Sequence, residues 1–331
     1  SSQTGRPLSP PRVIQQTNKR ISLILRGSGK DARLPILKSI TDYVVSSGGK
    51  RIRPLFTYYL GNAHGLSANE LIDLGALIEI VHASSLLHDD VIDGADERRS
   101  RPTASKLHGN KVAVLAGDHL LSTGLKHLNT FGNQSYMDIF THAIRALSAA
   151  ELLQMEYQYN LKTTEDIHDR VIEGKTAVLF EAAGALVAVM RGERNPYASE
   201  TAKLGHLFGR YFQLRDDYLD YFDSERLKKK GLQDFTGGIV TRPLMKLLQT
   251  ADRTEKNLIH AQWPGRGRQT SAVDANRILS LMRKHRIDVD CAAELEALEK
   301  QILRGLSALP GAAAREVISR EFQKILAVRA A

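Results

Sequence analysis

Apolar residues recur at helical spacing along almost the whole chain. Leu71, Leu74, Ile78 and Val81 fall at intervals of three and four, and further apolar residues between positions 71 and 88 fill the other faces. This spacing predicts a helix that is buried on most of its faces. The same reasoning predicts helices over residues 113–131, 137–159, 177–191, 198–222, 241–250, 274–284 and 290–309.

Short breakers such as Gly94 and Pro264-Gly265 separate these segments, and no alternating β-branched run or internal repeat interrupts them. We therefore expect an all-α fold, a single-domain helical bundle of about ten or more helices. Three segments have no helical pattern. They predict a mobile tail over residues 1–12, which leaves 13–331 as one domain, a flexible loop over 226–242 and a polar loop over 262–271.

Composition is that of an ordinary globular protein, with 42% apolar and 25% charged residues in 331. The single cysteine, Cys291, excludes a disulfide framework and any metal site built from cysteines. The longest weakly charged stretch, residues 177–190, is too short to cross a bilayer. The polar N-terminal residues contain no secretory signal, so we expect a cytoplasmic protein.

The net charge of +9 raises the question of a nucleic-acid partner. The basic residues are scattered, and only 6% of residues are aromatic, which leaves few platforms on which bases could stack. A scattered basic surplus fits small anionic ligands or an anionic membrane surface at least as well as nucleic acid.

Two acidic triples have the same spacing, and each follows an apolar helical stretch. The first consists of Asp89, Asp90 and Asp93, and the second of Asp216, Asp217 and Asp220. On a helix the first and last members of each triple share a face. Clustered carboxylates need a cationic partner, and all-oxygen ligands suit Mg²⁺ that bridges to phosphate. A solvated acidic face beside arginines is the alternative interpretation.

Basic residues lie near the first triple in sequence. Arg98 and Arg99 follow it, and the stretch from Gly48 to Pro54 precedes it with Lys50, Arg51 and Arg53. Arginine binds phosphate through two parallel hydrogen bonds, and lysine binds it as a compact charge. Carboxylates beside clustered basic residues favour a protein that holds two diphosphates, one of them through a metal.

These motifs resemble those of the trans-isoprenyl (polyprenyl) diphosphate synthase family, from about Thr41 to Pro243. The matching stretches are Gly-Gly-Lys-Arg-Ile-Arg-Pro, Leu-His-Asp-Asp-Val-Ile-Asp with Arg98-Arg99, Gly-Lys-Thr-Ala at 174–177 and Phe-Gln-Leu-Arg-Asp-Asp-Tyr-Leu-Asp. Around the first triple the sequence looks most like bacterial octaprenyl-type enzymes. The resemblance implies the isoprenoid synthase fold around a central cavity, usually a homodimer, and condensation of isopentenyl diphosphate with an allylic diphosphate.

The resemblance also implies roles for individual residues. Mg²⁺ would be held by Asp89 and Asp93 on one wall of the cavity and by Asp216 on the other. Asp90, Asp217 and Asp220 would support these three catalytic carboxylates. The residues implied for isopentenyl diphosphate are Lys50, Arg53, His82 and Arg99. Those implied for the allylic substrate are Arg98, Lys175, Thr176 and Gln213, with Lys175 also catalytic.

In this mechanism the metal and the basic side chains stabilise charge on the departing diphosphate, and an allylic cation forms. The double bond of isopentenyl diphosphate attacks the cation, and a proton is lost. Water must be excluded, and the segment 226–242 is a candidate lid.

The segment after the second triple departs from the family pattern. Where the family has Glu-Gly-Lys, this chain has Gly237, Gly238 and Ile239, so a lysine that helps bind the allylic diphosphate is missing. Residues 228–230, all lysines, or Arg242 are possible substitutes.

Product length is indicated by the residues that precede the first triple. In the family, bulky aromatics four and five places before it stop chain growth, and here these places hold Ser85 and Ser84. Small residues favour a product longer than C20, with peripheral membrane contact for its release.

Four alternatives remain open. A short-chain synthase of C15–C20 products shares all the motifs. A class I terpene cyclase shares the fold but needs neither Lys50 and Arg53 nor a second acidic triple. A regulatory subunit of a heteromeric synthase is supported by the altered segment 237–239 and opposed by two intact triples. A nucleic-acid binder would be retained on DNA in a salt-dependent manner.

Overall fold

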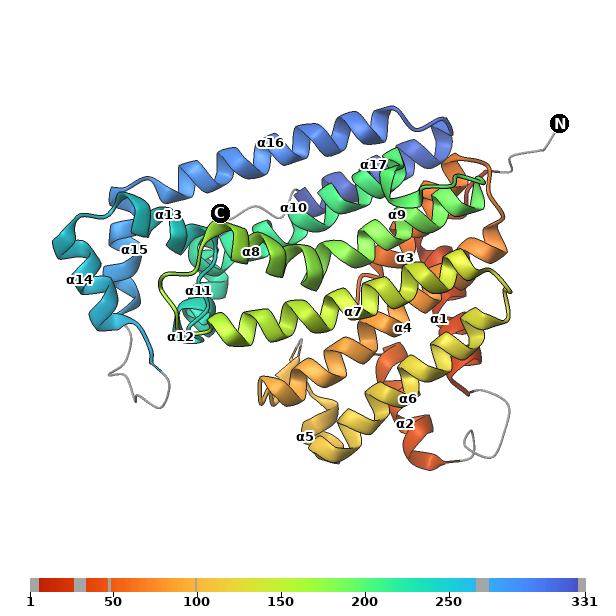
Figure 1. The fold of residues 1–331 in the computed structure, drawn as a ribbon, viewed down its shortest axis with the longest axis horizontal. Coiled ribbons are helices and arrows are strands. Elements are labelled where there is room, and N and C mark those ends of the chain that lie inside the picture. The colour runs from red at the N-terminus through yellow and green to blue at the C-terminus, as the bar shows by residue number, and fades with distance from the viewer. Residues whose placement is uncertain (1–5, 27–33, 47–48, 99, 266–273, 327–331) are drawn as a thin grey trace. The chain divides into compact units, whose positions relative to one another are not determined.

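The structure, a computed structural model, describes residues 6–26, 34–46, 49–98, 100–265 and 274–326. It is built almost entirely of helices (Figure 1), which confirms the all-α prediction. The only sheet in the described ranges is a two-stranded antiparallel hairpin of β1 (Glu97–Arg98) and β2 (Arg101–Pro102).

The chain divides into two compact units. The first comprises residues 1–144, 179–205 and 308–319, and the second comprises 145–178, 206–307 and 320–331. The helices up to the first boundary are α1 (Pro10–Arg26), α2 (Pro35–Ser46), α3 (Ile52–Ala63), α4 (Ala68–Ile92), α5 (Ala104–His108), α6 (Asn110–Asn129) and α7 (Gln134–Tyr157). Those that follow are α8 (Glu165–Ile172), the π-helical turn η2 (Glu173–Ala177), α9 (Val178–Met190), the 3₁₀ turn η3 (Pro196–Ala198), α10 (Glu200–Phe222), α11 (Ser224–Lys230), α12 (Gln233–Thr236), α13 (Arg242–Thr250), α14 (Arg253–Gln262), α15 (Ala275–Lys284), α16 (Ile287–Ser307) and α17 (Ala312–Leu326).

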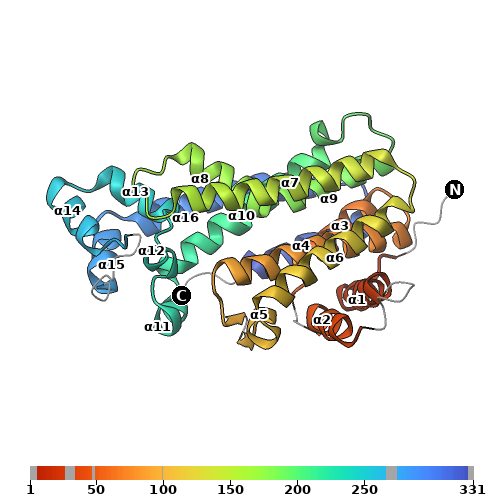
Figure 2. The ribbon, with the colours of Figure 1, turned by 60° about the horizontal axis from the view of Figure 1, so that its bottom comes forward.

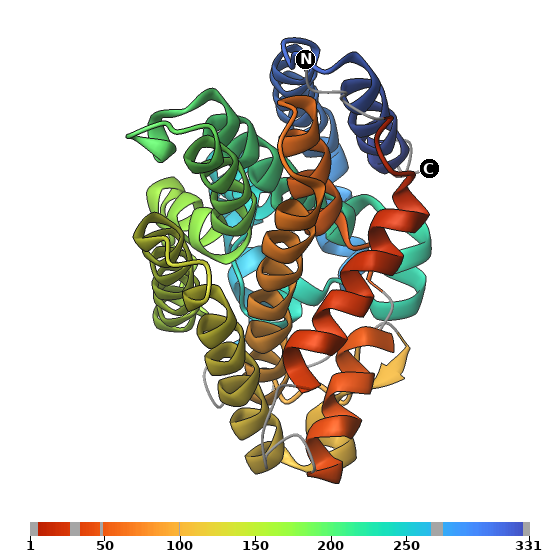
Figure 3. The ribbon, with the colours of Figure 1, turned by 90° about the vertical axis from the view of Figure 1, so that its right-hand side faces the viewer.

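Helix α4 is the central element of the first unit. It packs against α1, α3 and α6 (Figure 3), and its buried residues lie on every face, as the continuous apolar pattern predicts. By length and composition α4 could also cross a membrane, contrary to the expectation that no stretch is long enough. Since 67% of its apolar window is buried within the protein, this is weak evidence for a membrane span.

Close contact between α4 and α6 depends on a glycine. A Cβ atom at Gly117 would lie 2.3 Å from Nε2 of His88, so only glycine leaves room for the imidazole. The hydroxyl of Ser84 donates a hydrogen bond of 2.9 Å to the carbonyl oxygen of Gly117. Both contacts fix the half of α4 that carries the first acidic triple.

The second unit has its own apolar core. Helices α13 to α16 surround buried side chains that include Phe235, Leu244, Ile259, Trp263 and Met282. The indole of Trp263 packs edge-on against the ring of Phe235, with the ring centroids 5.0 Å apart. This core supports α12 and the segment that leads into α13 (Figure 2).

Two of the segments expected to lack helix contain it. Residues 10–12, placed in the N-terminal tail by the sequence, form the first turn of α1, and Leu8 exchanges hydrogen bonds with Tyr58 and Tyr59. The predicted loop 226–242 contains most of α11 and all of α12. The carboxylate of Asp223 caps α11 by accepting two backbone N–H groups, and Gly231 ends it at a φ of 67°. Of the predicted loop 262–271, residues 266–271 lie outside the described ranges.

Candidate active site

A cavity of about 230 Å³ lies in the second unit, beside the second acidic triple. It is lined by side chains from α7, α8, η2, α10 and the segment between α12 and α13. The polar members of its lining are Gln154, Tyr157, Gln158, Thr163, His168, Lys175, Gln213, Asp216, Asp217, Asp234 and Thr241. Three of the residues expected to bind or react with the allylic substrate, Lys175, Gln213 and Asp216, therefore line one cavity.

The π-helical turn η2 presents Lys175 and Thr176. A Cβ atom at Gly174 would lie 2.6–2.7 Å from atoms of Ala146 and Ala150, so glycine allows this wide turn to pack closely against α7. The ammonium of Lys175 forms an ion pair of 3.0 Å with Glu151. Single π-helical turns are common at functional sites, because they redirect side chains out of the regular helical register.

Asp216 is the exposed member of the second triple. Its side chain is 59% exposed, and Oδ1 accepts a hydrogen bond of 2.8 Å from Arg226 of α11. Burial alone would lower the pKa of Arg226, but the hydrogen bond to Asp216 raises it above the usual range. Asp216 is therefore a cavity carboxylate with a permanent cation beside it.

Asp217 is buried and held by hydrogen bonds on both oxygens. Oδ2 lies 3.1 Å from Nε2 of His168, and Oδ1 accepts a hydrogen bond of 2.9 Å from the side-chain amide of Gln213. The amide oxygen of Gln213 in turn accepts a hydrogen bond of 2.7 Å from the hydroxyl of Thr176. A continuous chain of contacts thus joins α8, α10 and η2 along the cavity.

Asp220 lies four residues after Asp216 on α10 but has a different environment. It is 1% exposed, and its carboxylate accepts backbone N–H groups from Gln233 and Asp234 at the start of α12. Burial raises the pKa of Asp220, and the hydrogen bond from the Asp234 backbone lowers it. Burial also raises the pKa of the Asp234 side chain well above its usual range, and the charges of Asp220 and Asp217 raise it further.

The segment with the altered family pattern is ordered against the end of α7. Gly238 has a φ of 70°, and a Cβ atom there would lie 2.2 Å from the ring of Tyr159. The side-chain amide of Gln158 donates a hydrogen bond of 2.8 Å to the carbonyl of Gly237. This fixed backbone places Ile239 in the cavity lining, where the family has a lysine.

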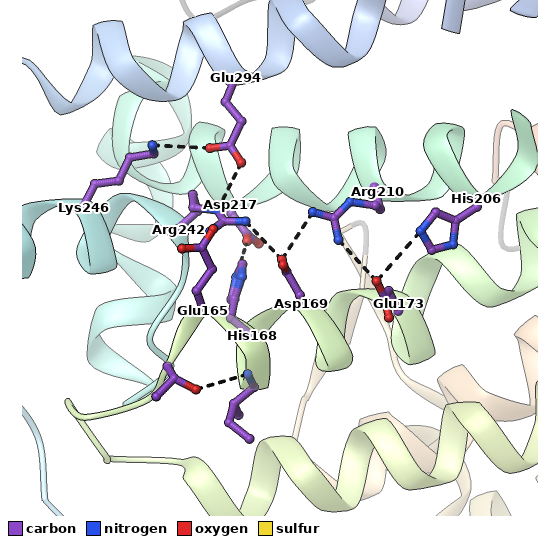
Figure 4. Close-up of polar contacts among 12 residues, drawn as sticks. Glu165, His168, Asp169, Glu173, His206, Arg210, Asp217, Arg242, Lys246 and Glu294 are labelled. Atoms are coloured by element: carbon purple, nitrogen blue, oxygen red, sulfur yellow. Dashed lines mark hydrogen bonds and ion pairs between the residues drawn. The ribbon is translucent and has the colours of Figure 1, made fainter. Parts of the chain in front are cut away.

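Arg242, suggested as a substitute for that lysine, is engaged elsewhere. It is 6% exposed and forms ion pairs with Glu165, Asp169 and Glu294 (Figure 4). The suggestion is therefore wrong for Arg242. Lys228 pairs with Glu225 on the surface.

Helix α8 is held in place by a ladder of ion pairs. Glu165 and Asp169 of α8 and Glu173 of the following turn η2 are spaced four positions apart and face Arg242 of α13 and Arg210 of α10 (Figure 4). The ladder fixes the rotation of α8 about its axis. It therefore also fixes where His168 meets Asp217.

In the first unit, Asp90 is the buried member of the first triple. Its Oδ1 accepts hydrogen bonds of 2.9 Å and 2.7 Å from Nε and Nη2 of Arg98, and the Asp90 side chain is 2% exposed. Asp89 is half-buried, and Asp93, which ends α4, is exposed. Arg98, expected to contact the allylic substrate, is thus bound to the acidic triple, and Arg99 lies outside the described residues.

The basic motif of the first unit has two functions. Lys50 is exposed, and the guanidinium of Arg53 lies 5.1 Å from the centroid of the Phe180 ring. Arg51, between them, is buried in a left-handed backbone conformation, with its Nη1 atom 2.8 Å from Oε1 of Glu79. The middle arginine is therefore a structural residue.

A small cavity of about 40 Å³ lies beside this motif, lined by His82, Asp90 and Arg98 among others. Lys50 and Arg53 are not part of its lining. Ser84 is buried against α6, and the hydroxyl of the half-buried Ser85 donates to the carbonyl of His82. Neither serine hydroxyl is left without a backbone acceptor.

The donor set suits a divalent cation that keeps part of its shell as water or phosphate. Within the described residues, no group of three or more His, Cys, Asp or Glu side chains forms a complete metal cage. The two more exposed carboxylates of the first triple, Asp89 and Asp93, and the exposed Asp216 are all-oxygen ligands, which Mg²⁺ prefers in small numbers. The residues present therefore fit Mg²⁺.

Sequence reasoning missed three residues of these sites: His168, Arg226 and Arg51. Arg51 lay inside a recognised motif, but its burial was not predictable from the motif. His168 and Arg226 lie outside the acidic motifs, and only the folded chain brings them to Asp217 and Asp216.

Comparison with known proteins identifies the family. A sequence model of the family described as polyprenyl synthetase matches residues 34–281. The chain is 34% identical over 248 residues to the octaprenyl diphosphate synthase of Escherichia coli strain K12, which covers 75% of this chain and 73% of that protein. It is 30% identical over 243 residues to heptaprenyl diphosphate synthase component 2 of Geobacillus stearothermophilus, covering 73% of this chain and 74% of that one.

A solved structure supports the same family over nearly the whole length of the chain. The decaprenyl diphosphate synthase of Rhodobacter capsulatus superposes with a TM-score of 0.86 and 30% identity over 96% of this chain and 97% of that one. The fold is thus the isoprenoid synthase fold. With a family match over most of its length and relatives above 30% identity, the chain belongs to the polyprenyl synthetase family, whose members are polyprenyl diphosphate synthases.

Proposed function

We propose that this protein is a Mg²⁺-dependent trans-prenyltransferase that condenses isopentenyl diphosphate with an allylic diphosphate and makes a product longer than C20. The observation that carries the proposal is the cavity of the second unit, where the exposed Asp216 carboxylate lies with Lys175 and beside Arg226. A carboxylate for a metal and cations for phosphate oxygens are the groups that a diphosphate leaving group requires.

Each group has a chemical role in this proposal. Asp89, Asp93 and Asp216 would hold Mg²⁺, which supplies charge stabilisation to the departing diphosphate. Lys175, Thr176 and Gln213 would bind and orient the allylic diphosphate. The remaining ligand set, Lys50, Arg53, His82 and Arg99, would serve isopentenyl diphosphate, and Arg98 would contact the allylic diphosphate.

Chain length is the part of the proposal that rests on Ser84 and Ser85. Neither is bulky, and both hydroxyls are satisfied by backbone carbonyls, so neither presents an unpaired polar group to an apolar product. The proposal includes a cytoplasmic homodimer that contacts a membrane only when the apolar product is released.

Incubation with labelled isopentenyl diphosphate, Mg²⁺ and farnesyl or geranylgeranyl diphosphate tests the proposal, with products sized by chromatography. A ladder that ends above C20 supports it, products that stop at C20 or below overturn the chain-length part, and no product with any primer overturns the whole. Asp89→Ala and Asp216→Ala should each lose nearly all turnover. Asp138→Ala, a change to an exposed aspartate of α7, is the matched control and should retain it.

Ile239 favours a second candidate function, that of a subunit which supports a catalytic partner. Its apolar side chain lines the cavity in place of a cation and weakens the site for an anionic substrate. Turnover by the isolated chain would discard this candidate. An inactive isolated chain that regains turnover as Ile239→Lys would support it.

A further inference from the structure

His168 lines the cavity of the second unit but belongs to none of the motifs recognised in the sequence. It is 5% exposed, and its Nε2 atom lies 3.1 Å from Oδ2 of Asp217. Within the described chain, its Nδ1 atom is buried with no hydrogen-bond partner. Burying an imidazole costs desolvation energy, and the contact with Asp217 is the interaction that offsets this cost.

We infer that His168 is a positioning residue for the allylic diphosphate, acting through Asp217 on the cavity-lining Gln213. The inference rests on the proposed function, because it concerns how the residues that would bind the allylic diphosphate are held in place. It names a residue that lies outside every motif recognised in the sequence.

The first step is the contact between His168 and Asp217. Asp217 is 3% exposed and accepts from Gln213 through its other oxygen, so the carboxylate is fixed from both sides. An ionised carboxylate accepts hydrogen bonds and donates none. The proton between Asp217 and His168 must therefore be on Nε2 of His168. The imidazole is therefore held with Nε2–H towards Asp217.

The second step runs from Asp217 to the substrate side. Gln213 donates its amide N–H to Asp217, which forces its amide oxygen to face the other way. That oxygen accepts the hydroxyl proton of Thr176, at 2.7 Å. With both ends of its amide fixed by Asp217 and Thr176, the cavity-lining Gln213 holds its second N–H in one orientation, as positioning of a substrate requires.

The third step concerns how α8 keeps His168 in place beside Asp217. Glu165 and Asp169, on either side of His168 in sequence, are paired with Arg242, and Asp169 also pairs with Arg210 (Figure 4). These ion pairs fix α8 against α10 and α13 without using His168. The imidazole is therefore free to serve Asp217 alone.

The matched test compares His168→Gln with His168→Met. The two replacements have the same length, but only glutamine keeps an N–H at the place of Nε2. We expect His168→Met to raise the KM for the allylic diphosphate by about 10- to 100-fold, since a hydrogen bond to a buried charge is lost. The KM for isopentenyl diphosphate should stay unchanged, and His168→Gln should stay within about threefold of the native protein. Equal losses in both variants, or equal changes in both KM values, would overturn the inference.

His206→Met is the control for histidine removal. His206 lies on α10 outside the cavity lining and faces Glu173, so its loss should leave both KM values unchanged. Comparable unfolding midpoints for the His168 variants exclude a merely structural effect.

A second measurement separates failure of this inference from failure of the proposed function. Nitrogen NMR of histidine-labelled protein, with His168 assigned by the glutamine variant, reports which ring nitrogen carries the proton and needs no turnover. A proton on Nε2 supports the inference even if no primer is elongated. A neutral ring with its proton on Nδ1 overturns it even if the enzyme is active.

Discussion

Replacing Arg51 by methionine should destabilise the first unit more than almost any other single change to its polar residues. Arg51 is 5% exposed, and its guanidinium donates to Oε1 of Glu79 at 2.8 Å and to Oδ1 of Asn18 at 2.9 Å. It also donates to the carbonyls of Val44 and Val45 at 3.1 Å and 3.0 Å. One side chain therefore ties together α1, α2 and α4, and the start of α3.

The magnitude follows from the burial of both partners. Glu79 is 6% exposed, so removal of Arg51 leaves a buried carboxylate without its cation, which costs about 3–5 kcal/mol. Methionine keeps most of the volume of arginine and leaves the left-handed backbone at this position unchanged, so charge is the main difference. In the double variant Arg51→Met, Glu79→Met both charges are gone. Its loss of stability should be smaller than the sum of the two single-variant losses, by about 1–3 kcal/mol or more.

Urea unfolding followed by circular dichroism measures the three free energies of unfolding. Lys203→Met is the control, because Lys203 is 58% exposed and pairs with a 90% exposed Glu200 in the same unit. It should change the free energy of unfolding by less than about 0.5 kcal/mol. A cost below about 1 kcal/mol for Arg51→Met, or strictly additive single variants, would refute the reasoning.

Three further changes test other parts of the structure. Gly238→Ala should destabilise the protein by about 1–3 kcal/mol more than Gly132→Ala, because φ is positive at both glycines (70° and 63°) but only at Gly238 would the new Cβ meet a neighbouring side chain, the Tyr159 ring; equal unfolding midpoints of the two variants would contradict this. Burial raises the pKa of Cys291 to about 12, so the only thiol should react with a disulfide reagent at pH 8 only after denaturation, and rapid labelling of the native protein would count against that burial. Hydrogen bonding, chiefly from Lys284, lowers the pKa of Glu255 from 4.5 to about 2, so its contribution to stability is complete above pH 4.5 and is lost as the pH falls towards 2. Glu255→Gln should therefore flatten the dependence of the unfolding midpoint on pH between 4.5 and 2, and an unchanged slope would contradict the assignment.

The helices were predictable because the apolar spacing that stabilises them recurs at every turn along the sequence. The pattern from Leu71 to His88 predicts α4, which extends from Ala68 to Ile92, and α10 and α13 begin within two residues of the predicted positions. Burial of an apolar face acts on every turn of a helix, so the signal accumulates along the segment. The position of a helix end depends on fewer residues and was less exact.

The segment 226–242 was misinterpreted because its helices do not depend on an apolar repeat. Helix α11 is polar and begins at the Asp223 cap, and α12 begins where its backbone N–H groups meet Asp220. Both anchors are contacts that follow from capping or tertiary structure, and neither changes the composition of the segment. A lysine-rich segment with three glycines therefore looked like a loop.

The acidic triples show most clearly what spacing can and cannot establish. Helical geometry correctly gathers the carboxylates, but it treats Asp216 and Asp220 as equivalent, and one is 59% exposed while the other is 1% exposed. The difference arises because a buried carboxylate must find donors, and those donors come from elsewhere: Asp220 takes two backbone N–H groups, and Asp217 takes His168 and Gln213.

The second triple is therefore one exposed carboxylate supported by two buried ones. The buried pair anchors α12 and the hydrogen-bond chain of the cavity, and this holds α10 in the orientation that exposes Asp216. The first triple repeats the arrangement in part, since Asp90 is buried with Arg98 while Asp93 is exposed. In both triples the middle aspartate is buried and hydrogen-bonded to neighbouring side chains, so its replacement should lower the free energy of unfolding as well as affect turnover.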